Sequence, residues 1–147
     1  MITRKLTIIA QDPSVKKSDG KILTAQIEIP YEELSPGPRG YRLNIVDYDS
    51  TQKVFYKPYS IKNNTDEFEN QSDSTLLNSP EFHAQNVYVI IMRLLTKFEF
   101  AFGRRVPWGS NIHQLNICPH AFADANAYYS DYDNGIFFGY FANNTGK

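Results

Sequence analysis

A stretch of apolar residues with helical spacing, between residues 80 and 102, constrains the fold of this chain more than any other feature. Asn78 or Ser79 suits the N-cap of such a helix, and Gly103 suits its end. Pro80 and Glu81 suit the first turn, where a missing N–H does no harm and the helix dipole favours a carboxylate. The predicted inward face consists of Ala84, Val87, Tyr88, Ile91, Leu94, Leu95, Phe98, Ala101 and Phe102, with Val89, Ile90 and Met92 as apolar residues beside it. The sequence therefore predicts a helix that packs against protein on more than one side.

The sequence before this helix has the pattern of short strands. Residues 3–10 are apolar and β-branched, and residues 21–29 alternate between apolar and polar side chains. Alternation returns over residues 41–48, and residues 53–56 would pair with them across a turn at Asp49 and Ser50. We therefore expect strands at all four places, the last two forming a β-hairpin.

The sequence after the helix also has a β pattern. Residues 112–117 alternate as a strand does, whereas Pro119 argues against the centre of a sheet and residues 121–125 suit a connector. Residues 126–130 and 136–141 form the clearest hairpin, because the Asn134–Gly135 pair between them tolerates positive φ.

These elements predict an α+β fold. It comprises a small antiparallel β module at residues 1–60, an acidic polar surface linker at 61–79, and a long helix packed on an antiparallel sheet or hairpin at 80–147.

Composition excludes some functions and favours a compartment. The net charge of the 147 residues is -1, so nucleic acid and anionic membranes are not expected partners. Cys118 is the only cysteine, which excludes an intrachain disulfide and favours a reducing compartment. The N-terminal sequence lacks the apolar core of a signal peptide, and no apolar run approaches the ~20 residues of a membrane span. We predict a cytoplasmic protein.

The residues that could act in catalysis or bind a metal form no recognisable motif. His83, His113 and His120 lack metal-ligand spacing, and we expect His83 to have a surface or packing role. Cys118 and His120 could form a nucleophile and base, but Pro119 separates them and an inert buried thiol is the favoured interpretation. The prediction is a chain with no catalytic residue and no metal site of its own.

Two pairs of aspartates lie at turns. Asp47 and Asp49 suit bonds to nearby backbone amides better than a cation site. Asp131 and Asp133 partly match a calcium loop, but the donors needed to complete one are missing and turn capping is favoured.

Two short motifs give a family resemblance over residues 80–141. A long helix ends in Phe102-Gly103-Arg104, and the first strand of a later hairpin carries Asn126-Ala127-Tyr128. In this order and spacing the chain resembles the N-terminal subdomain of thermolysin-like zinc metallopeptidases, the gluzincins. In that family the strand forms the upper rim of the cleft and holds the substrate peptide extended. The resemblance implies that Asn126, Ala127 and Tyr128 are substrate-binding residues.

The chain departs from the family in its chemistry. The His-Glu-x-x-His helix that holds zinc in those peptidases does not occur between Met1 and Lys147. The expectation is therefore the N-terminal, substrate-rim part of a zinc metallopeptidase, inactive alone. The only cofactor implied is zinc, bound by further sequence that also supplies the C-terminal catalytic subdomain as partner.

Two other functions stay open on sequence grounds. One is a stand-alone peptide- or protein-binding module without enzymatic activity, which would use the edge at residues 126–130 or an aromatic patch around Trp108. The other is carbohydrate binding through exposed Tyr and Trp rings. An incomplete domain would also expose apolar surface and self-associate through it.

Overall fold

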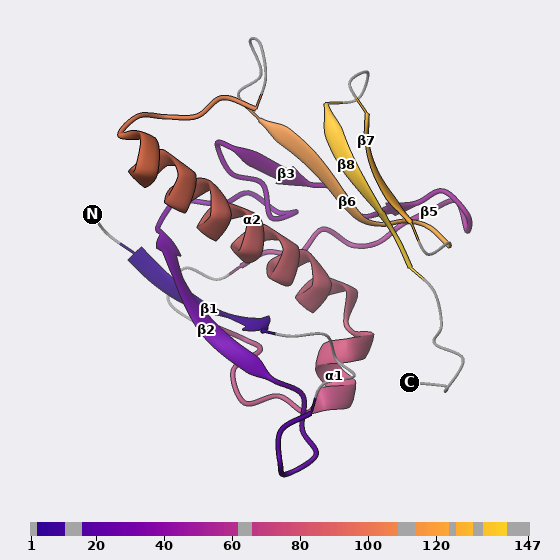
Figure 1. Ribbon diagram of the computed structural model, residues 1–147. Coiled ribbons are helices and arrows are strands. Elements are labelled where there is room, and N and C mark those ends of the chain that lie inside the picture. The colour runs from indigo at the N-terminus through magenta and orange to yellow at the C-terminus, as the bar shows by residue number, and fades with distance from the viewer. Residues whose placement is uncertain are drawn as a thin grey trace.

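The computed structural model describes residues 3–10, 16–61, 66–108, 114–123, 126–130 and 134–140. It has an α+β fold, as predicted. The long helix α2 (Pro80–Phe102) crosses the molecule with the two-stranded sheet β1–β2 on one side and a four-stranded sheet on the other (Figure 1). Buried apolar side chains from the helix and both sheets form one core. Side chains from both sides of the predicted 61–79 boundary share this core.

Helix α2 has the bounds that the sequence predicts. The Ser79 hydroxyl caps it by accepting a hydrogen bond from the N–H of Phe82 at 3.1 Å, and Gly103 ends it with a φ of 69°. No helix within the described ranges is long and apolar enough to cross a membrane.

The predicted inward face of α2 is partly wrong. Leu94, Phe98 and Phe102 are at least half exposed. The helix is apolar on two sides, and its position between the sheets selects the side that carries Gln85, a residue that the apolar pattern passes over. The buried residues are Phe82, Ala84, Gln85, Tyr88, Val89, Met92 and Leu95.

The first sheet confirms the first two predicted strands. Strand β1 (Thr3–Ile9) pairs antiparallel with β2 (Thr24–Pro30). Leu6, Ile8 and Ile29 are buried in the core.

The segment at residues 61–79 contains more structure than a linker requires. Helix α1 (Asp73–Asn78) forms there, with the Ser72 hydroxyl as its N-cap. Phe68 and Leu76 are buried in the core. This segment therefore contributes to the core as well as connecting its neighbours.

The four-stranded sheet has the order β3–β6–β8–β7. Strands β3 (Leu43–Ile45), β6 (Leu115–Phe122) and β8 (Gly135–Gly139) are parallel, and β7 (Ala127–Ser130) is antiparallel to β8. The sheet is therefore mixed, whereas the sequence predicted antiparallel pairing.

The predicted strand at 41–48 is two short strands. β3 pairs with β6, and only β4 (Tyr48–Asp49) pairs with β5 (Val54–Phe55) in the expected hairpin. Residues 43–45 do not join the expected hairpin, because β3 pairs with a strand more than seventy residues along the chain.

The prediction for Pro119 is also wrong. Pro119 lies within β6, which is a central strand, and residues 121 and 122 continue that strand where a connector was expected. The register between β6 and β8 shifts between Cys118 and Phe122, so Pro119 has no paired residue on β8. On the other side, pairing with β3 ends at Ile117. A proline is tolerated because this bulge requires no N–H from it.

The β7–β8 hairpin confirms the prediction at residues 126–130 and 136–141 in its described part. Asn134 takes the positive φ, 50°, in the turn. Gly135 serves a different need, because a Cβ there would lie 2.8 Å from the backbone oxygen of Asn116. The predicted roles of Asp131 and Asp133 lie outside the described residues.

Candidate functional site

Strand β7 is an edge of the four-stranded sheet. Among the strands that the structure describes, it pairs only with β8. The Gly139 N–H donates to the Asn126 oxygen at 2.7 Å, which fixes the alternation of the antiparallel ladder. Ala127 and Tyr129 therefore direct their backbone N–H and C=O groups away from β8. These are the groups that an additional strand would bind.

The three predicted binding residues lie together on this edge. Asn126, Ala127 and Tyr128 are all exposed. The Asn126 side-chain oxygen accepts a hydrogen bond from the Ala127 N–H at 2.8 Å, so it caps this donor as a structural asparagine would. The carbonyl of Ala127 and both backbone groups of Tyr129 still face outward. Tyr129, which sequence reasoning did not select, is thus the main outward residue.

Tyr128 connects the edge to a cavity of about 440 Å³ on the sheet face, which we call the aromatic pocket. The Tyr128 ring stacks between Phe122 and Phe137, with centroid distances of 5.8 and 5.2 Å. The Tyr48 and Phe55 rings from the β4–β5 hairpin line it as well, with centroids 4.5 Å apart. The lining is completed by Val46, Ser50, Asn116, Cys118 and Ala121.

Polar groups that line the aromatic pocket are bonded to the protein itself. The Cys118 thiol donates to the Tyr48 carbonyl at 3.0 Å, and the Ser50 hydroxyl donates to the Ala121 carbonyl at 2.6 Å. The Asn116 side-chain oxygen accepts from Asn44 at 3.1 Å. The pocket therefore presents mainly carbon surface, which suits an apolar side chain or ligand.

Cys118 is not arranged as a nucleophile. Burial raises the pKa of its thiol, and its hydrogen bond goes to a backbone carbonyl. His120 is bound elsewhere, between Asp47 and His83. The possible Cys118–His120 pair is not formed, in agreement with the favoured interpretation of an inert thiol.

Residues 46–50 alternate between the aromatic pocket and a buried polar cluster. Val46, Tyr48 and Ser50 line the pocket. Asp47 and Asp49, the residues between them, are at most 9% exposed and form side-chain hydrogen bonds on the opposite side. One short segment thus forms a wall of the pocket and an anchor of the cluster.

The buried cluster contains a chain of three hydrogen bonds. Asp47 Oδ1 lies 2.7 Å from His120 Nδ1, His120 Nε2 lies 2.8 Å from His83 Nδ1, and His83 Nε2 lies 2.9 Å from the Leu77 carbonyl oxygen. His83 is half-buried and packs against the rings of Phe82 and His120, in keeping with the packing role, but its hydrogen bond to a second histidine was not expected. Spacing in the sequence gives no signal of this pair, since the bulge in β6 and the packing of α2 bring the two rings together.

Asp49 completes the cluster. Its carboxylate accepts hydrogen bonds from the Tyr140 hydroxyl, from the Thr51 N–H at 2.9 Å and from the Gln52 N–H at 3.1 Å. Burial opposes its ionisation, but these bonds outweigh burial and lower the pKa of Asp49. The predicted bonding to local amides is confirmed for Asp49 and wrong for Asp47, which pairs with His120.

The patch proposed around Trp108 is largely occupied by its own chain. The Trp108 Nε1–H donates to the Arg42 carbonyl at 2.8 Å, and the Arg42 guanidinium carbon lies 5.3 Å from the ring centroid. A half-buried ring in these contacts offers little stacking surface to a sugar or a peptide.

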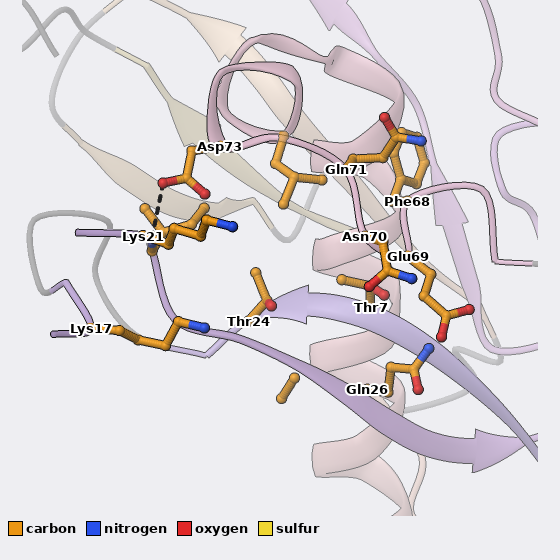
Figure 2. Close-up of a pocket in the computed structure, with 13 residues that line it drawn as sticks. Thr7, Lys17, Lys21, Thr24, Gln26, Phe68, Glu69, Asn70, Gln71 and Asp73 are labelled. Atoms are coloured by element: carbon orange, nitrogen blue, oxygen red, sulfur yellow. Dashed lines mark hydrogen bonds between the residues drawn. The ribbon is translucent and has the colours of Figure 1, made fainter. Parts of the chain in front are cut away.

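A second cavity, of about 460 Å³, lies between the β1–β2 sheet and α1 and has a polar lining (Figure 2). Lys17 and Lys21 point into it, and the Asp73 carboxylate at its rim accepts the Ile22 N–H at 3.0 Å. Both lysines are exposed, and exposed ammonium groups on long stems fix no ligand geometry. This cavity carries weaker evidence of function than the aromatic pocket.

Within the described ranges there is no group of three or more His, Cys, Asp or Glu side chains arranged to hold a metal ion. His113 lies outside these ranges. Comparisons with protein-family models, with curated proteins and with solved structures found no match. Function is therefore argued from the geometry of the site.

Proposed function

We propose that this protein binds an extended peptide by adding it as a strand to β7, with an apolar peptide side chain in the aromatic pocket. The observation that carries the proposal is that one strand supplies both parts of the site. The outward carbonyl of Ala127 and the outward N–H and C=O of Tyr129 lie on the same strand as Tyr128, whose ring lines the pocket.

The geometry of a sheet defines how the peptide would lie. An added strand lies about 4.8 Å from β7, and its side chains alternate between the two faces of the sheet. The peptide residue opposite Tyr128 would direct its side chain to the face of the aromatic pocket. Its two neighbours would face the other side of the sheet, so one large apolar residue, opposite Tyr128, gives specificity.

The peptidase proposal adds chemistry to the same mode of binding. Asn126, Ala127 and Tyr128 on an exposed edge strand are compatible with the rim of a zinc peptidase cleft. In that case a zinc-bearing segment would cut the peptide that β7 holds. The alternative is an interaction module that holds the peptide without cutting it, and both share the binding step that the site supports.

The experiment is a selection from a random-peptide display library on the purified protein, followed by affinity measurements for the enriched peptides. Tyr129→Pro removes an N–H that points away from β8, so it weakens peptide pairing and leaves the β7–β8 ladder intact. Tyr128→Ala removes a wall of the pocket. We expect each change to weaken binding at least about tenfold, which corresponds to about 1.4 kcal/mol.

Tyr41→Ala is the matched control, because Tyr41 is 62% exposed and does not line the aromatic pocket. Circular dichroism should show that all three variants keep the native fold. Enriched peptides that bind Tyr128→Ala and Tyr129→Pro as tightly as the unchanged protein would refute the proposal, as would a selection that enriches none.

A further inference from the structure

The hydrogen-bond chain through the two histidines has a defined number of protons. The Leu77 carbonyl at one end can only accept, and so can the ionised Asp47 carboxylate at the other. Three hydrogen bonds therefore require three protons on the ring nitrogens of His83 and His120. Two neutral imidazoles carry one proton each, so the complete chain holds one positive charge.

The surroundings place this charge mainly on His120. Its ring contacts the Asp47 carboxylate, whereas His83 lies in the first turn of α2, where the helix dipole disfavours a cation. Burial, followed by the neighbouring His120, lowers the pKa of His83. His83 is thus the neutral ring, accepting a hydrogen bond at Nδ1 and donating one at Nε2.

Other titratable groups around the pair favour keeping the charge. The Asp49 carboxylate on β4 interacts with His120, and the Tyr140 hydroxyl after β8 donates to Asp49. Burial and the charges of Asp49 and Asp47 raise the pKa of Tyr56, whose ring lies 5.5 Å from that of His120. With the Cys118 thiol neutral, two carboxylates face one imidazolium.

We propose that the positive charge shared by His83 and His120 holds the wall of the aromatic pocket in place, so that the pocket loosens when the pair becomes neutral. Asp47, at one end of the chain, lies between Val46 and Tyr48, which line the pocket. Loss of the third proton leaves the lone pairs of His120 Nε2 and His83 Nδ1 facing each other, and the hydrogen bond between the rings opens. A role of this pair in regulating peptide binding rests on the proposed function.

Lowering the pH also breaks the hydrogen bond between the two rings, but by adding a proton. A fourth proton would place two N–H groups against each other across the same contact between the rings. The ordered wall therefore needs the singly charged pair, and peptide affinity should fall on both sides of that state. Neutral pairs arise as pH rises, and doubly charged pairs arise as it falls.

The test follows the histidine ring nitrogens and the pocket by NMR across about pH 5 to 9, a range that spans ordinary histidine titration. We expect three protonated ring nitrogens on the pair in the charged state and two after its loss. The ring signals of Tyr48 and Phe137 should shift with the same midpoint. A pair with two protons throughout, or pocket signals that do not follow the pair, would overturn the proposal.

Two variants sharpen the test. Asp47→Asn removes the nearest counter-charge of the histidine pair. The titration midpoint of the ring nitrogens and the midpoint of the Tyr48 and Phe137 signals should therefore move together to lower pH, by about 1 to 3 units. Asp19→Asn changes an exposed aspartate that contacts the Lys17 ammonium at 3.9 Å and accepts the Lys21 N–H at 3.0 Å, and it should move neither midpoint. The unchanged protein alone decides the question if Asp47→Asn does not fold. None of these measurements needs a peptide, so their outcome is separate from that of the peptide selection.

Discussion

Removal of the Glu99 carboxylate should destabilise the protein strongly, because it leaves a buried guanidinium without its counter-charge. Glu99 accepts hydrogen bonds from Arg42 at 2.9 Å and from the Val106 N–H at 2.8 Å. The Arg42 side chain is only 9% exposed, whereas that of Glu99 is 25% exposed. Breaking a buried ion pair by removing one partner costs about 3–5 kcal/mol. The partial exposure of Glu99 places Glu99→Ala near the lower end, about 3 kcal/mol.

Glu99→Gln separates charge from hydrogen bonding. Its amide oxygen still accepts from one donor, so the expected cost is about 1.5–2 kcal/mol, as for a hydrogen bond to a charged group. Urea unfolding, followed by circular dichroism and by the fluorescence of Trp108, measures both variants. Glu33→Ala is the control, since Glu33 is exposed and should change stability by less than about 0.5 kcal/mol.

The pH dependence gives an independent check. Burial opposes ionisation of Glu99, but the bonds from Val106 and Arg42 outweigh it and lower its pKa below the ordinary value of 4.5. The unfolded chain therefore takes up this proton first, so the stabilisation is present above pH 4.5 and is lost as pH falls through the folded pKa. The stability difference between the unchanged protein and Glu99→Gln should shrink in acid. A cost of Glu99→Ala no greater than that of Glu33→Ala would refute the reasoning.

Three further changes test local features by the same unfolding assay. Ser79→Ala removes the cap that accepts the Phe82 N–H and should cost about 1 kcal/mol; no loss would show that another group caps α2. Gly103→Ala should cost about 1–2 kcal/mol through its φ of 69° alone, since a Cβ there meets no atom within 4 Å. Gly135→Ala should cost about 1–3 kcal/mol through its contact with Asn116, and equal behaviour of this variant and the unchanged protein would contradict that contact.

Self-association through exposed apolar surface stays a prediction, and the structure shows a stripe of such surface on α2 where it can be tested. Ile90, Leu94, Phe98 and Phe102 lie four residues apart and are between 43% and 60% exposed. Phe98→Glu should shift sedimentation toward the monomer if this stripe joins two copies. Sedimentation that is unchanged in the variant would exclude the stripe as the contact.

The elements predicted well from sequence depend on neighbouring residues. Ser79, Pro80 and Gly103 determine the ends of α2 within a few positions of themselves, so its bounds could be predicted. Asn134 likewise defines the turn before β8. The edge location of residues 126–130 was also expected, although the hydrogen bond from the Ala127 N–H to the Asn126 side chain depends on a rotamer that sequence does not reveal.

The elements predicted poorly depend on distant partners. Leu43 of β3 pairs with Leu115, so the sheet is mixed for reasons that no local pattern contains. Pro119 is acceptable only because the register shifts beside it. His83 and His120 meet because a helix and a bulged strand pack together, and each residue alone resembles an ordinary polar side chain.

The position of β6 between β3 and β8 also has a consequence for how the chain folds. Its ladder with β3 joins residues more than seventy positions apart, whereas its ladder with β8 joins residues fewer than twenty positions apart. Contacts of high sequence separation slow folding, because the loop entropy is lost before the contacts form. The β1–β2 and β6–β8 ladders both join residues that are much closer in sequence, and α2 is local throughout. We therefore expect these elements to form early and the pairing of β3 with β6, which completes the four-stranded sheet, to form last.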